Sequence, residues 1–189
     1  MSGCRLILAS ASPRRAELLH TAGVTFSVQT AEVDESTLPD EAPESYVTRV
    51  ARAKAEAVAQ RCRQRGEVVL AADTTVVVNG EILGKPRGPD DAIRMLTMLS
   101  GRIHDVFTGV VAIGDTGSLE DVVRTRVRML PIGADDIQWY VDSGEPDGKA
   151  GAYAIQGRAS RFVDWIEGSW SNVVGLPVAT VHQLLKRIT

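Results

Sequence analysis

Short apolar runs and amphipathic stretches follow one another along this chain, and their pattern predicts both strands and helices. Strands are expected where apolar residues run together, and helices where they recur every third or fourth position. Strands are predicted over residues 5–9, 25–29, 68–72, 74–78, 81–83, 103–114, 119–130 and 161–166. Helices are predicted over residues 13–22, 43–64, 89–99, 134–142 and 177–188. Because the elements keep no strict strand–helix–strand rhythm, we expect an α/β fold with a mixed β-sheet and flanking helices.

Polar residues interrupt this pattern at informative places. Asn79-Gly80, between two apolar runs, predicts a β-hairpin with a type I′ turn. Residues 30–42 are acidic and are expected to form a loop, and the glycine-rich residues 144–160 another, with room for a short helix. Lys54 lies close to the apolar stripe of helix 43–64, so it either extends to the surface or points into a cleft toward phosphate or carboxylate. That stripe comprises Tyr46, Val47, Val50, Ala51, Lys54, Ala55 and Val58.

Composition describes an ordinary globular chain of 189 residues, a length that suits one sizeable domain or two tightly joined lobes, and we expect a single domain over residues 1–189. The net charge of −3 argues against a general nucleic-acid or anionic-membrane binder, which would need excess basic charge. No apolar stretch is long enough to span a membrane, and the N-terminus does not resemble a signal peptide. The two cysteines, Cys4 and Cys62, lack metal-type spacing and fit a reducing compartment, so the cytoplasm is expected.

The N-terminal segment carries a candidate phosphate site. Ser12 is a suitable N-cap and Pro13 suits the first turn of a helix. Arg14 and Arg15 then lie where the helix dipole is positive, which makes sense if an anion docks there with Ser10, Ser12 and the two guanidinium groups. The alternative is a capped surface helix whose arginines pair with local acids.

Asp73 is the sharpest candidate for chemistry, because it ends an apolar strand. Ligands in α/β proteins commonly bind beyond the carboxyl ends of strands, where a carboxylate can accept a proton or hold a hard cation. The alternative is an aspartate that caps a turn through the N–H of Thr75. The loop over residues 30–42 contains several acids, one of which is Glu35. These acids either are solvated or supply one ligand that binds a metal together with Asp73.

Lys85 lies between Gly84 and Pro86, where the chain is rigid, and is either a phosphate contact or a solvated turn residue. A Walker-type loop is excluded, because Pro86 replaces the Ser or Thr that would touch magnesium. The three histidines have no mutual zinc spacing, and His104 is expected to be structural.

Taken together, these segments resemble the Maf family of nucleoside triphosphate pyrophosphatases over the whole chain. The motifs are Ser10-Ala-Ser-Pro-Arg-Arg15, Ala51-Arg-Ala-Lys54-Ala55, Ala72-Asp73-Thr74, Gly84-Lys85-Pro86, the run from Ser100 to Val110, Glu145-Pro146, Lys149-Ala-Gly-Ala-Tyr-Ala-Ile-Gln156-Gly157 and Ser171-Asn172-Val-Val-Gly175-Leu-Pro177. The resemblance implies an inosine-triphosphate-pyrophosphatase-like fold, elongated and two-lobed with a central cleft. It also implies hydrolysis of a nucleoside triphosphate to the monophosphate and pyrophosphate with a divalent cation, Mg²⁺, Mn²⁺ or Co²⁺.

The resemblance further implies roles for individual residues. Asp73 matches the proton acceptor that activates water and, with Glu35, the metal-binding acids. Lys54 and Lys85 match catalytic residues that contact phosphate, and Arg15 matches a substrate-binding residue. Three further positions match those that distinguish substrate subtypes: Arg14, Thr74 and Gln156.

The pattern around Gln156 looks like the branch that hydrolyses dTTP and UTP. A glutamine amide both donates and accepts, as the O4 and N3–H edge of thymine or uracil requires, whereas a glutamate only accepts. One departure is that Gly148, not an acid, precedes Lys149; Asp147 lies one place earlier. The alternatives are a nucleotide-sensing regulator of septum formation and a pyrophosphatase selective for purines or 7-methyl-GTP. Modified pyrimidine nucleotides remain candidate substrates, and a homodimer is left open.

Overall fold

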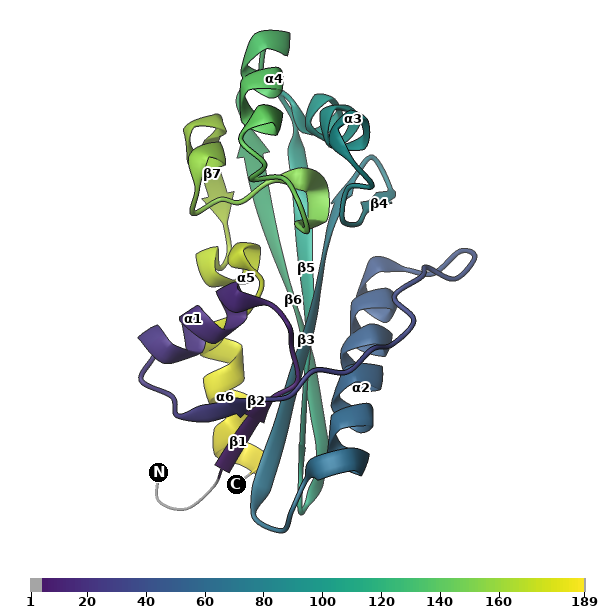
Figure 1. Cartoon of the computed structure of the whole chain (residues 1–189), viewed down its shortest axis with the longest axis vertical. Coiled ribbons are helices and arrows are strands. Elements are labelled where there is room, and N and C mark those ends of the chain that lie inside the picture. The colour runs from purple at the N-terminus through teal and green to yellow at the C-terminus, as the bar shows by residue number, and fades with distance from the viewer. Residues whose placement is uncertain (1–4, 189) are drawn as a thin grey trace. The chain divides into compact units, whose positions relative to one another are not determined.

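The computed structural model describes residues 5–188, and their contacts divide the chain into two compact units. Unit 1 comprises the residues up to Thr74, then Thr108–Val123 and the residues from Gly175 on. Unit 2 comprises Thr75–Phe107 and Arg124–Val174. Residues 5–188 form a seven-stranded mixed sheet of order β2-β1-β3-β5-β6-β7, with β4 paired to β3 (Figure 1). The predicted fold class, a mixed β-sheet with flanking helices, is therefore confirmed.

Three long strands contribute to both units, and the other elements belong to one. The long strands are β3 (Glu67–Val78), β5 (Ile103–Gly114) and β6 (Gly117–Met129). Unit 1 adds β1 (Arg5–Leu8), α1 (Pro13–Thr21), β2 (Phe26–Val28), α2 (Pro43–Cys62) and α6 (Val178–Ile188). Unit 2 adds β4 (Glu81–Leu83), α3 (Pro89–Leu99), α4 (Ala134–Asp142), η1 (Ala150–Ala152), η2 (Arg158–Phe162), β7 (Val163–Glu167) and α5 (Trp170–Val174).

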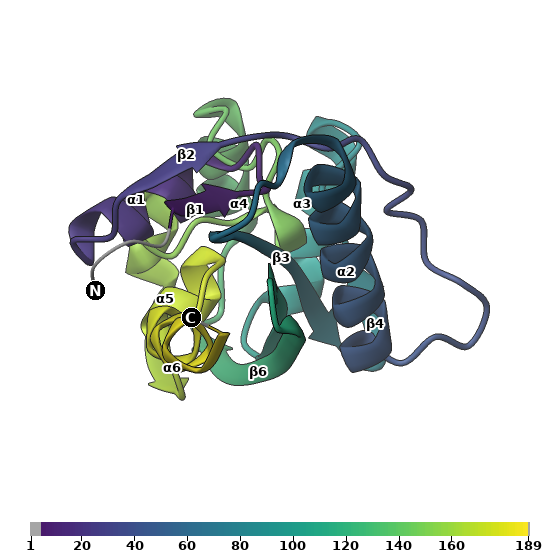
Figure 2. The ribbon, with the colours of Figure 1, turned by 90° about the horizontal axis from the view of Figure 1, so that it is seen from below.

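Unit 1 has a core on each face of its strands. β1 pairs in parallel with both β2 and β3, so its side chains alternate between two buried faces. Leu6 and Leu8 point to the face that α1 and α6 cover, and Ile7 points to the face that α2 covers. Figure 2 shows the strands between α2 and the α1–α6 side. This layering directs one face of α2 toward the middle of β3.

The stripe predicted on helix 43–64 is the buried face of α2. All seven residues of the stripe are buried. Two of them are polar at their ends, Tyr46 and Lys54, and both are less than a tenth exposed. The pattern therefore placed a lysine amine in the interior, where it needs a partner.

Unit 2 surrounds the other halves of the long strands. β4 pairs antiparallel with β3 through a turn in which Asn79 and Gly80 have φ of +52° and +80°, as the predicted type I′ turn requires. β7 pairs antiparallel with β6, and α3 packs against α4 and η1. The ring of Tyr140 in α4 meets that of Phe162 edge to face. This packing holds the glycine-rich segment after α4 in place.

Several predicted boundaries were wrong. The strand predicted to end at Asp73 continues to Val78, the strand placed at 161–166 is Val163–Glu167, and the one placed at 119–130 is Gly117–Met129. The short helix α5 was not predicted, because five residues are too few to show a helical period. Among the described residues, no helix is long and apolar enough to cross a membrane. Cys4 lies outside the described residues.

Candidate functional site

Asp73 lies inside β3, and this position defines the centre of the candidate site. The sequence placed Asp73 at a strand end, but Thr74–Val78 is a β-branched run that extends the strand, with Thr75 fully buried. The alternative prediction, that Asp73 caps a turn, is therefore wrong. The Asp73 side chain is only 9% exposed, so a carboxylate sits in the interior of unit 1 and requires a charged or hydrogen-bonding partner.

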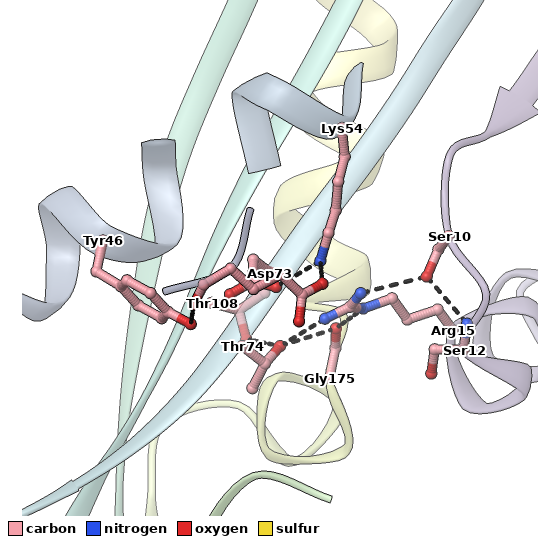
Figure 3. Close-up of polar contacts among 10 residues, drawn as sticks. Ser10, Ser12, Arg15, Tyr46, Lys54, Asp73, Thr74, Thr108 and Gly175 are labelled. Atoms are coloured by element: carbon pink, nitrogen blue, oxygen red, sulfur yellow. Dashed lines mark hydrogen bonds and ion pairs between the residues drawn. The ribbon is translucent and has the colours of Figure 1, made fainter. Parts of the chain in front are cut away.

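Lys54 of α2 is that partner. Its Nζ lies 2.7 Å from Oδ1 of Asp73 and 2.6 Å from Oε1 of Glu35, and its side chain is 10% exposed (Figure 3). The structure thus decides between the two expectations for Lys54: it points inward, toward two carboxylates. It also brings Glu35 and Asp73 to one point, although the sequence separates them by half of the loop and the whole of α2.

The loop that carries Glu35 is fixed against α2. The hydroxyl of Tyr46 donates to the backbone carbonyl of Glu35 at 2.9 Å, and Arg49 Nη2 donates to the carbonyl of Ser36 at 2.8 Å. Arg49 also forms a bidentate ion pair with Glu41, at 2.6 and 2.7 Å. Burial, reinforced by the nearby carboxylates of Asp73 and Glu35, raises the pKa of Tyr46 to about 12, so its hydroxyl stays a donor. Tyr46 was predicted only as a core residue, and this contact was not foreseen.

Arg15 reaches into the same region from α1. Its Nε donates to the carbonyl of Gly175 at 2.7 Å, Nη1 to Ser10 Oγ at 3.2 Å and Nη2 to Thr74 Oγ1 at 3.1 Å. Burial lowers the pKa of Arg15, and the neighbouring Asp73 opposes that shift. A guanidinium has five N–H donors, so one on each Nη lacks an acceptor among the described residues. These two N–H groups remain as donors for an anion.

The bland alternative for this helix, arginines paired with local acids, is wrong for Arg15, since none of its three acceptors is a carboxylate. Arg14, beside it, is half-buried. Ser12 is the N-cap residue of α1 and Pro13 lies in its first turn, as predicted, but the hydroxyl of Ser12 makes no capping bond. Instead the N–H of Ser12 donates to Ser10 Oγ at 3.2 Å, so Ser10 orders the entry to α1 and contacts Arg15 as well.

Thr74 connects Arg15 to the long strands. Its Oγ1 lies 2.9 Å from Thr108 Oγ1 and 3.3 Å from the carbonyl of Gly175. The hydroxyl of Thr74 is therefore occupied by protein groups and fixes the guanidinium of Arg15. Thr108 and Gly175 belong to the sequence motifs, but the sequence analysis predicted no role for them. No local pattern indicates one, because their contacts join distant parts of the chain.

The two remaining predicted residues, Lys85 and Gln156, belong to unit 2, and both are exposed. Their segments are joined by a hydrogen bond from the N–H of Gly151 to the carbonyl of Gly84 at 3.1 Å. A Cβ at Gly151 would lie 2.8 Å from Val76, so the close approach requires glycine. His104 is buried, with Nε2 2.8 Å from the Tyr153 hydroxyl, which agrees with the structural role expected of it.

The carboxylates of Glu35 and Asp73 fit a small divalent cation. Both contact the same Nζ, so the two acids meet at one point of the structure. Among residues 5–188 no cluster of three or more His, Cys, Asp or Glu side chains could hold a metal. Mg²⁺ is typically held by one or two carboxylates, with substrate phosphates and water completing its shell. The pair therefore suits an ion that arrives with a phosphate substrate.

Two solved structures share the fold. The Ham1 protein of Staphylococcus aureus has a TM-score of 0.57 and 14% identity, covering 98% of this chain and 100% of that one. A HAM1 protein of Coxiella burnetii has a TM-score of 0.54 and 15% identity, covering 97% of this chain and 99% of that one. These likenesses show the fold, and they agree with the expected inosine-triphosphate-pyrophosphatase-like fold.

The chain belongs to the Maf-like protein family, whose sequence model matches residues 5–188. A protein of Anaeromyxobacter sp. (strain Fw109-5), named dTTP/UTP pyrophosphatase, is 54% identical over 188 residues, covering 97% of this chain and 89% of that one. A protein of the same name in Myxococcus xanthus is 52% identical over 182 residues, covering 96% and 91%. The family resemblance seen in the motifs is therefore confirmed.

Proposed function

We propose that this chain is a nucleotide pyrophosphatase that hydrolyses dTTP and UTP to the nucleoside monophosphate and pyrophosphate. Nucleotide pyrophosphatase activity is supported by family membership and by relatives of 52% and 54% sequence identity that carry the name dTTP/UTP pyrophosphatase. Divalent metal dependence, action on modified pyrimidine nucleotides and a cytoplasmic location are parts of the same proposal.

One observation carries the proposal. Buried Lys54 contacts both Asp73 and Glu35, and Arg15, whose guanidinium has two N–H groups without an acceptor among the described residues, lies in the same region. Attack on a phosphorus atom develops negative charge on its oxygens and on the departing pyrophosphate. Fixed cations in a low-dielectric site stabilise that charge more strongly than they would in bulk water.

The residues of unit 1 divide the work. Arg15, oriented by Gly175, Ser10 and Thr74, presents its two remaining N–H groups to a phosphate oxygen pair. Lys54 adds a second positive charge and orients Asp73 by holding Oδ1. The other oxygen of Asp73 then accepts a proton from the attacking water.

Glu35 and Asp73 would hold the divalent cation in this proposal. When bound there, such an ion neutralises phosphate charge as a Lewis acid. Tyr46 donates to the backbone carbonyl of Glu35, so the loop that carries this acid is held against α2.

Gln156 supports the choice of a pyrimidine. Among the described residues, no side chain hydrogen-bonds to its amide, which leaves a donor and an acceptor for the O4 and N3–H edge of uracil or thymine. Exposed Lys85, held between Gly84 and Pro86, supplies a further cation for phosphate.

The test is a panel of nucleoside triphosphates incubated with Mg²⁺ or Mn²⁺, with separate measurement of pyrophosphate and orthophosphate. We expect pyrophosphate and the monophosphate from dTTP and UTP. Stepwise release of orthophosphate through a diphosphate would refute the reaction type. A wild-type protein that prefers 7-methyl-GTP would refute the proposed substrate while leaving pyrophosphate release intact.

The choice of base has its own variant. Gln156→Glu should lower the ratio of kcat/KM for UTP to that for 7-methyl-GTP, because a carboxylate cannot donate to O4. A mismatched hydrogen-bonding group costs roughly 1–3 kcal/mol, so the ratio should fall about tenfold or more. An unchanged ratio would remove Gln156 from base recognition.

A further inference from the structure

The backbone that follows Gln156 is held by a single carboxylate from a distant loop. Glu145, which follows α4, accepts the N–H of Arg158 at 3.1 Å on Oε1 and the N–H of Ala159 at 3.4 Å on Oε2. These are the first two N–H groups of η2, which have no partner within the helical turn. Glu145 therefore acts as an N-terminal cap supplied from 13 residues upstream.

The residue between Gln156 and η2 must be small for this contact to form. A Cβ on Gly157 would lie 2.2 Å from Oε1 of Glu145 and 2.6 Å from its Cδ. The carboxylate thus occupies the space that any side chain at position 157 would need. Glu145 and Gly157 form a matched pair, at the residue directly next to Gln156.

The other side of Gln156 is anchored as well. The N–H of Ala154 donates to the Tyr140 hydroxyl at 3.1 Å, and the N–H of Gly157 donates back to the carbonyl of Ala154 at 3.0 Å. Ala154 and Ile155 are buried, whereas Gln156 is exposed. The turn therefore has two fixed ends and presents one exposed amide between them.

From this geometry we propose that Glu145 is a positioning residue for base selection: it sets the direction of the Gln156 side chain by capping η2. The proposal rests on the proposed function, in which Gln156 contacts the pyrimidine. In this proposal Glu145 acts through Gln156 and does not itself contact the nucleotide. An amide discriminates between bases only when its orientation is fixed. Loosening the cap should therefore reduce the selectivity between nucleotides more than it reduces kcat.

Two substitutions approach the contact from opposite sides. Glu145→Ala removes both acceptors, and Gly157→Ala displaces the carboxylate while leaving it present. Each should lower the ratio of kcat/KM for UTP to that for 7-methyl-GTP by about tenfold, with a smaller loss of kcat. Glu145→Gln keeps the size and one acceptor, so it should retain part of the selectivity. Asp142→Asn, an exposed acid at the end of α4 whose carboxylate accepts from Gln138, is the matched control and should leave the ratio unchanged.

Amide hydrogen exchange of residues 154–162 gives a readout that does not depend on activity. Glu145→Ala should speed exchange at Arg158 and Ala159, and Asp142→Asn should not. Unchanged exchange would overturn the positioning role whatever the enzyme does. An equal loss of kcat/KM for both nucleotides would overturn it too, because that is the result of a merely structural contact. If the wild type shows no preference for UTP, the proposed function fails instead, and exchange alone decides whether Glu145 caps η2.

Discussion

Replacing Asp73 by asparagine should abolish proton acceptance while leaving the site nearly intact. Oδ1 of Asp73 lies 2.7 Å from Lys54 Nζ, and a lysine ammonium can only donate. The amide of Asp73→Asn is therefore forced to place its oxygen toward Lys54. Its NH₂ group then stands where the second carboxylate oxygen stood, so a donor replaces the proton acceptor.

The structure makes the catalytic loss larger than the loss of stability. General-base catalysis contributes about 10²–10⁴-fold, which is roughly 3–5.5 kcal/mol of transition-state free energy. Lys54 keeps its ion pair with Glu35 at 2.6 Å and retains a neutral acceptor at position 73. The free energy of unfolding should therefore fall by only about 1–2 kcal/mol.

The assay measures pyrophosphate release from UTP, giving kcat/KM, alongside urea unfolding of the same preparation. Asp164→Asn is the control, since it also removes a carboxylate from an ion pair, the 2.9 Å contact with Arg128, but on an exposed strand. Its activity should match the wild type, with a change in stability below about 1 kcal/mol. If Asp73→Asn keeps kcat/KM within about threefold of the wild type, Asp73 is not the general base.

Two further predictions concern other charged and buried groups. Lys54→Ala and Lys85→Ala should each lower kcat/KM for UTP by about 10²-fold or more through lost phosphate contacts. Of the two, only Lys54→Ala should also lower the free energy of unfolding, by roughly 3 kcal/mol, because it leaves buried Asp73 unpaired. Full activity in both variants would show that these lysines are not part of the substrate site. Burial lowers the pKa of His104 from 6.5 to about 4, against a smaller opposing effect of Asp105, so the unfolded chain takes up the proton first as pH falls. Stability should therefore decrease by about 2 kcal/mol between pH 7 and pH 5, and His104→Gln should remove most of that decrease in urea unfolding; an equal pH dependence in both proteins would contradict it.

The sequence predicted the elements well where one face of an element decides its pattern. The stripe on α2 was identified in full, and Asn79-Gly80 adopts the two positive φ values that its turn was expected to need. Asp73 was placed wrongly because a carboxylate after an apolar run is typical of a strand end. The ammonium of Lys54, 19 residues earlier, makes the burial of this carboxylate within β3 tolerable.

The candidate site was predicted as a set of residues, but their contacts were not. Arg15 and Gly175 are 160 residues apart, so no local sequence pattern indicates their 2.7 Å hydrogen bond. The same is true of Glu145 and η2, where the signal is the absence of a side chain at Gly157. Such contacts depend on how the chain closes on itself, which periodicity does not report.

The chain passes from one unit to the other four times, after Thr74, Phe107, Val123 and Val174. Neither unit is therefore a continuous stretch of sequence, and no single truncation can isolate one of them. During synthesis the N-terminal strand β1 and helix α1 must wait for α6, which completes their core, to leave the ribosome. Contacts of such long sequence separation slow folding. We therefore expect cotranslational intermediates of this chain to expose the apolar residues of β1 and β3 until α6 docks.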